Sequence, residues 1–160
     1  VYNEQLMTTT SGSAAAGHIV FAASPGDQPV IDGTGVDTGN NGVLIGHDYI
    51  KLLGFEVRNW NDNGIWVEGA GWVEIADCVV HDVTYGIGFS DGAHDFVLDR
   101  VEMYAFDLYG FDASQGPAPC FNGTLNDCIA HSARDPGSLI SPRSGSKASD
   151  ARPVSSCSMG

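Results

Sequence analysis

Apolar and polar residues alternate with period two through the middle of the chain, and the alternating blocks return at a nearly fixed spacing. The block is clearest as Asn-Gly-Ile-Trp-Val-Glu at residues 63–68, and variants of it stand at 41–46, 85–90 and 109–114. The marker glycines of the four copies, which lie 22, 22 and 24 residues apart, are Gly42, Gly64, Gly86 and Gly110. A fixed period of this length is typical of repeat proteins.

A second alternating block follows each marker glycine. It consists of two short apolar runs separated by two polar or small residues, and it recurs at residues 50–57, 73–80, 96–103 and 123–130. Period two predicts strands, because an amphipathic helix would need apolar residues at i, i+3, i+4 and i+7. Similar blocks lie a whole repeat apart, so each should stack in parallel on the next, about 4.8 Å away. The pattern predicts an all-β fold, a right-handed parallel β-helix (a solenoid) with about 22 residues and three short strands per coil.

The register of the repeats predicts three columns of inward-facing residues. These columns are Val43, Ile65, Ile87 and Phe111; Leu52, Ile75, Leu98 and Leu125; and Phe55, Cys78, Val101 and Cys128. Cys78 and Cys128 are two coils apart, about 9.6 Å, which exceeds the roughly 7 Å Cα separation that a disulfide tolerates. They are therefore expected to be core residues. Cys120 and Cys157 lie outside the columns, so they are either free thiols or joined to each other by a disulfide.

The repeats end near Pro136, where the composition changes. Residues 1–136 carry 4 basic and 19 acidic side chains, a net charge of −15, whereas residues 137–160 are rich in Ser, Gly and Pro and carry three basic side chains and one acidic. We therefore divide the chain into a β-helix domain, residues 1–136, and a C-terminal tail, residues 137–160. The tail composition favours disorder unless the tail caps the last coil or contacts another chain.

Charge and hydropathy exclude two classes of partner. The net charge of −13 argues against nucleic acid, because phosphate binding needs clustered Lys and Arg. No run of 18 apolar residues is present, so no membrane-spanning helix is expected. The chain begins Val-Tyr-Asn without Met, as expected for a secreted protein that has lost a signal peptide or for an excised fragment.

Two stretches resemble the pectate-lyase-like family of secreted parallel β-helix proteins. Residues 11–33, from Ser-Gly-Ser through His-Ile-Val-Phe to Pro-Gly-Asp-Gln-Pro-Val-Ile-Asp-Gly, are similar to the opening coils of that family, and residues 49–59 are similar to its generic coil. The resemblance covers about residues 3–136. It implies an extracellular protein that acts on an acidic polysaccharide, as a calcium-dependent uronate lyase or as a polysaccharide-binding protein. Because the same coils also serve non-catalytic proteins, a structural protein that self-associates through its β-helix ends or its tail is the alternative.

The resemblance places a substrate groove on the outward face of the first strand of each coil and on the turn before it. A lyase of this kind uses calcium to neutralise the uronate carboxylate and a base to remove the proton α to it. The candidate calcium ligands on this face are Asp62, Glu68, Asp107 and Asp112. Solvated turn carboxylates without a metal are the alternative interpretation.

Catalytic candidates come from an outward column on the third strand of each coil. Arg58, His81 and Tyr104 share this column with His131. Arg58 or His81 is the candidate base, and Tyr104 is the candidate proton donor. The alternative is that all are surface side chains with structural partners.

Candidate substrate contacts are Trp60, Trp66 and Ser90. Trp66 and Ser90 point outward in the predicted register, and Trp60 lies in a turn. The apolar face of a sugar ring suits an aromatic platform, so either tryptophan is able to stack on one. Packing is the alternative for both, and for Trp72.

Overall fold

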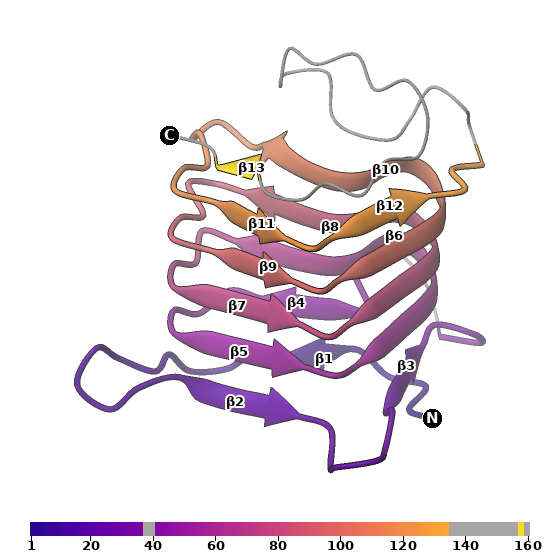
Figure 1. Cartoon of the computed structure of the whole chain (residues 1–160), viewed down its shortest axis with the longest axis horizontal. Helices are drawn as coiled ribbons and strands as arrows, with labels where there is room; N and C mark the ends of the chain where they lie inside the picture. The colour runs from indigo at the N-terminus through magenta and orange to yellow at the C-terminus, as the bar shows by residue number, and fades with distance from the viewer. Residues whose placement is uncertain (37–40, 135–156, 159–160) are drawn as a thin grey trace.

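The computed structural model describes residues 1–36, 41–134 and 157–158, and these form a stack of coils (Figure 1). The described part holds strands and turns, with no helix. The strands are β1 Leu6–Met7, β2 Ile19–Ala22, β3 Val30–Asp32, β4 Val43–Ile45, β5 Ile50–Leu53, β6 Glu56–Glu68, β7 Val73–Ala76, β8 Val79–Ser90, β9 Val97–Asp99, β10 Glu102–Gln115, β11 Thr124–Asn126, β12 Ile129–His131 and β13 Cys157–Ser158.

Two sheets enclose the core. One has the order β1-β4-β6-β8-β10-β12, with β3 also paired to β6, and the other has the order β13-β11-β9-β7-β5-β2. The strands pair in parallel, except that β13 runs antiparallel to β11. Val79 pairs with both Glu56 and Glu102, each 23 residues away, so one coil takes about 23 residues. The predicted parallel β-helix is confirmed.

The third strand of one coil continues directly into the first strand of the next. As a result β6, β8 and β10 are 13, 12 and 14 residues long. The register of β6 against β8 shifts between Trp60 and Asn63, where two residues of β6 oppose one of β8. Such a bulge bends a strand without ending its pairing, so the solenoid turns this corner within a continuous sheet.

The predicted core columns are confirmed by the strand register. Ile65 pairs with Val43 on one side and Ile87 on the other, and all three are buried. Cys78 and Cys128 are buried free thiols, as expected for core residues. The disulfide between Cys120 and Cys157, which the sequence left as an alternative, involves a side chain outside the described residues. Of the predicted tail, the structure describes only the backbone of β13.

Outside the core, two ion pairs connect successive coils. Lys51 pairs with Glu74 on the coil that follows. Arg100 donates to Asp77 on the preceding coil through Nε at 2.7 Å and Nη2 at 2.8 Å. Asp77 lies at the corner between β7 and β8, and Arg100 lies at the equivalent corner between β9 and β10. Both have a left-handed backbone, with φ of 54° and 52°.

The marker glycines are explained by close contact between successive coils. A Cβ on Gly42 would lie 2.7 Å from the carbonyl oxygen of Gly64, and one on Gly64 would lie 2.9 Å from that of Gly86. A Cβ on Gly86 would lie closer still to the carbonyl oxygen of Gly110. Larger residues would push the coils apart, so the motif is a packing requirement of the stack.

Gly86→Ala is expected to destabilise the protein by about 1–3 kcal/mol, because the added methyl group meets backbone atoms that cannot rotate away. The measurement is urea unfolding followed by circular dichroism. Gly46→Ala is the matched control, since a Cβ at Gly46 has no neighbour within 4 Å. Equal stability of the two variants would contradict this account of the motif.

Candidate functional site

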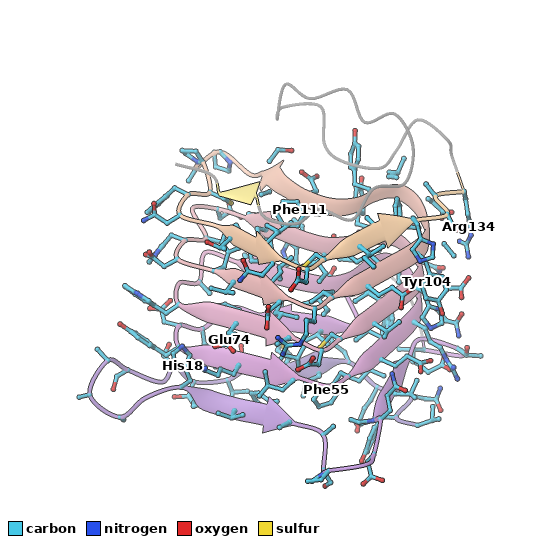
Figure 2. All side chains as sticks on the ribbon, viewed as in Figure 1. His18, Phe55, Glu74, Tyr104, Phe111 and Arg134 are labelled. Atoms are coloured by element: carbon cyan, nitrogen blue, oxygen red, sulfur yellow. The ribbon has the colours of Figure 1, made fainter. Side chains whose placement is uncertain are left out.

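The predicted column of Arg58, His81, Tyr104 and His131 is assembled on the outer face of the third strands. Successive members are strand partners in β6, β8, β10 and β12. The rings of His81 and Tyr104 stack with centroids 4.5 Å apart, and those of Tyr104 and His131 stack at 5.5 Å. Figure 2 shows Tyr104 on the same side of the solenoid as Arg134. Sequence reasoning therefore located this column correctly.

The contacts of Arg58 oppose its predicted role as a base. Its Nε donates to Asp32 Oδ2 at 2.8 Å, and its Nη1 donates to Glu56 Oε1 at 2.8 Å. The hydrogen bond to Asp32 is the largest of the effects that raise the pKa of Arg58 above its usual value. A base must lose its proton readily, and these ion pairs hold the proton in place.

The contacts of His81 also indicate a structural role. The residue is 8% exposed, and its two ring nitrogens face carboxylates: Nδ1 is 2.8 Å from Asp82 Oδ2 and Nε2 is 3.3 Å from Glu56 Oε1. Both nitrogens are therefore engaged by carboxylates of the protein itself. Burial raises the pKa of the neighbouring Tyr104, and nearby carboxylates raise it further, so its phenol stays protonated.

These contacts belong to a longer chain of ion pairs and hydrogen bonds. Asp82 also accepts a hydrogen bond from Arg134 Nη2 at 2.6 Å, and Arg134 Nη1 donates to Asp107 Oδ1 at 3.0 Å. In order, the chain is Asp32, Arg58, Glu56, His81, Asp82, Arg134 and Asp107. Structural ion-pair networks shift pKa values as active sites do, so the shifts here are explained by the network.

A second cluster lies on the outward side of the first strands, and we call it the Trp66 face. It consists of Asp62, Asn63, Trp66, Tyr85, Tyr109 and Asp112. Trp66, Gly88 and Asp112 are successive strand partners, and a Cβ on Gly88 would lie 2.5 Å from Cε3 of Trp66. The indole therefore rests on the backbone of the next coil, in space that only glycine leaves open.

The tyrosines stand beside this indole in the neighbouring column. Asn63, Tyr85 and Tyr109 are successive strand partners, and the two phenol rings are 6.2 Å apart. Burial raises the pKa of Tyr85, and the charges of Asp62 and Asp112 raise it further. The aromatic rings and the two carboxylates thus form one patch.

Two buried polar atoms on this side of the sheet have no hydrogen-bond partner. They are Asn63 Oδ1 and Ser90 Oγ, and no other such side-chain atom occurs in residues 1–36 and 41–134. Asn63 Nδ2 donates to Asn41 Oδ1 at 2.8 Å and to Asp62 Oδ1 at 3.2 Å, which fixes the orientation of the amide. A buried acceptor without a donor costs about 1–3 kcal/mol of stability. These two atoms are therefore free to form hydrogen bonds with a ligand.

Trp60 is a core residue, so the prediction that it contacts substrate is wrong. Its side chain is 1% exposed, and its Nε1 donates to the carbonyl oxygen of Ile31 at 3.4 Å. Asn59, directly before it, has a left-handed backbone with φ of 60°, which interrupts the side-chain alternation and turns Trp60 inward. Sequence periodicity could not reveal this conformation. Of the other predicted substrate contacts, Trp66 lies on the Trp66 face. Ser90 lies on the same side of the sheet, but it is only 1% exposed.

The four predicted calcium ligands do not gather at one point. Asp62 and Asp107 lie in the bulges of β6 and β10, two coils apart, and Asp107 is paired with Arg134. Glu68 is exposed at the end of β6, and Asp112 is 3% exposed and accepts from the Ser114 backbone at 2.9 Å. Among the described residues, no three His, Cys, Asp or Glu side chains form a group that could hold a metal.

Sequence reasoning missed a row of aromatic residues along another corner. The row consists of His18, Tyr49, Trp72, His94 and Phe121. Trp72 stacks on Tyr49 at 4.7 Å and meets His94 edge-on at 4.8 Å, which confirms packing as its role. Tyr49 and Trp72 both directly precede a strand, but His94 is the strand partner of Gly71, so the row has no constant repeat position.

The family assignment follows from this fold. A family model described as a right-handed β-helix region matches residues 22–158, so the chain belongs to that family. No match was found among the curated proteins or among the solved structures. Within the described ranges, no helix is long and apolar enough to cross a bilayer.

Asp32 at the start of the charge chain is expected to make stability depend on pH. Burial raises its pKa, but hydrogen bonds from Thr34, Asn59 and Arg58 outweigh burial and hold it well below its usual value. Because the folded-state pKa is depressed, the stabilisation is complete above about pH 4 to 5 and is lost as pH falls towards the folded-state pKa.

Asp32→Asn should therefore lower the free energy of unfolding by about 1–3 kcal/mol at pH 7, and the deficit relative to the parent chain should shrink between pH 5 and about pH 2. Urea unfolding across that range measures it. Asp127→Asn, at an exposed turn, is the control and should change little. A deficit that stays constant with pH would refute the assignment.

Proposed function

We propose that the protein binds an extracellular polysaccharide through the Trp66 face. The observation that carries this proposal is the Trp66 indole laid over Gly88 beside Tyr85 and Tyr109, on the outer side of stacked parallel strands. Aromatic rings contact the apolar faces of sugars, and neighbouring polar atoms take up hydroxyl groups. The resemblance of residues 3–136 to secreted β-helix proteins that act on polysaccharides supports the same conclusion.

Binding accounts for the described residues better than lyase chemistry. Each described Lys or Arg is held by carboxylates: Lys51 by Glu74, Arg58 by Asp32 and Glu56, Arg100 by Asp77 and Asp99, and Arg134 by Asp82 and Asp107. A lyase needs a base with a lowered pKa close to the substrate. The proposal accordingly requires neither calcium nor a bond-breaking step.

Trp66→Ala should weaken polysaccharide binding about tenfold, because an aromatic contact of this kind contributes about 1.5 kcal/mol. Calorimetry with a panel of soluble uronate, neutral and amino-sugar polymers measures the effect. Trp72→Ala is the control, since Trp72 is 40% exposed on a different corner and should leave affinity unchanged. Circular dichroism verifies that both variants fold.

Two results would overturn this proposal. The first is the absence of binding to every polymer in the panel. The second is absorbance from an unsaturated sugar product when the parent chain is incubated with polygalacturonate or alginate, with or without calcium. Such a product would show that the protein is a lyase and that its base lies elsewhere than the paired side chains described above.

Self-association is a second candidate function, favoured by the contrast between the two ends of the solenoid. At one end β13 covers the edge of β11, whereas at the other β2 is the outermost strand of its sheet (Figure 1). Val1, Tyr2, Met7 and Val20 are all more than half exposed there. A cavity of about 520 Å³ opens at the same end, between the N-terminal segment and Phe55. An unpaired strand edge beside apolar surface suits pairing with a second copy.

If this end joins two copies, the molar mass from light scattering should rise with concentration, and Val20→Lys should keep the protein monomeric. The charge on β2 would oppose an edge-to-edge contact. Leu108→Lys adds the same charge at a position that is 40% exposed on another face, so it should leave association unchanged. A monomer at every concentration would eliminate this candidate.

A further inference from the structure

The Trp66 face presents acceptors and carboxylates, and none of the described basic side chains pairs there. The four described Lys and Arg side chains each pair with carboxylates that lie outside this face. Residues 1–136 also carry a net charge of −15. Asp62 and the negative charge of residues 1–136 would repel a polyuronate brought to this face, so the acidic polysaccharide implied by the resemblance is a poor chemical match.

Asn63 shows what a ligand must offer at this face. Its amide nitrogen is already committed to Asn41 and Asp62, so the free atom is the acceptor Oδ1. That atom lies 2.9 Å from where a Cβ on Gly88 would stand, beside the Trp66 indole. The residue is 4% exposed, so the indole must swing away from Gly88 before a ligand group reaches Oδ1. Only a hydrogen-bond donor satisfies this atom.

Asp62 adds a negative charge next to that acceptor. It receives a hydrogen bond from Asn63 Nδ2 at 3.2 Å, and it takes part in none of the ion pairs of the described chain. Partial burial raises the pKa of Asp62, because it disfavours the charged carboxylate. A cation bound next to this carboxylate would offset that cost.

We propose that the Trp66 face selects a polysaccharide bearing protonated amines, a polymer of glucosamine, with an ammonium group at Asp62 and a hydroxyl or ammonium donor at Asn63 Oδ1. This inference rests on the proposed function, because it names the substrate class of the same face. The sugar ring lies against the Trp66 indole, which has rotated off Gly88. The tryptophan fluorescence of the protein therefore changes on binding.

The test compares three oligosaccharides of equal length by calorimetry and fluorescence at pH 5.5: a glucosamine hexamer, its fully N-acetylated counterpart and a galacturonate hexamer. The glucosamine hexamer should bind at least about tenfold more tightly than the acetylated one, as expected for one charge-assisted hydrogen bond. Asp62→Asn should remove that preference. Asp62→Glu, which keeps the charge, should retain it and guards against a folding defect.

Asp127→Asn is the matched control, because it removes one negative charge from an exposed turn outside the face. Asp127→Asn should preserve the preference for the glucosamine hexamer. If it lost as much of that preference as Asp62→Asn, the attraction to a polycation would be unspecific and the inference would be overturned. Equal binding of the glucosamine and acetylated hexamers, or tighter binding of galacturonate, would also overturn it while leaving polysaccharide binding intact. If the protein bound none of the three hexamers and no polymer of the wider panel, the proposed function itself would be rejected.

Discussion

The parallel stacking of one coil directly on the next is the constraint on which this molecule depends. Backbone hydrogen bonds between strands set the spacing at about 4.8 Å, and the marker glycines allow the approach because a Cβ at Gly42 or Gly64 would meet the carbonyl oxygen of the coil that follows. Since each residue stands above its counterpart one coil earlier, every outward side chain acquires fixed neighbours. Both surface clusters are consequences of this stacking.

The two clusters differ in how fully their polar groups are satisfied. On the third strands, His81 lies between the carboxylates of Glu56 and Asp82, and Arg58 pairs with Asp32 and with the same Glu56. On the first strands, Asn63 Oδ1 is buried without a donor, and Asp62 forms no ion pair within the described chain. Satisfied networks stabilise a fold, whereas unsatisfied groups cost stability and are retained where a ligand can use them. This difference, rather than the kind of residue, separates the paired column around His81 from the Trp66 face that we propose for binding.

The period of the repeat was sufficient to predict which residues share a column. It placed Arg58 with His81 and Tyr104, and it placed Trp66 outward. It was not sufficient to predict their chemistry, because the repeat does not mark the partners of these side chains. Arg58 pairs with Asp32, its strand partner 26 residues earlier, in a strand that does not resemble the repeat. Trp60 shows a second limit, since the left-handed backbone of Asn59 directly before it turned an expected surface residue into the core.

The sequence by itself determined the solenoid, its coil length, its core columns and its net negative charge, because hydrophobic period and charge are properties of the chain alone. The tertiary structure decided which polar groups satisfy one another and which do not. The bulges and left-handed corners set the direction of each side chain, and they follow from hydrogen bonding between coils rather than from local preference. The distinction between the paired column around His81 and the open Trp66 face therefore exists only in the folded stack.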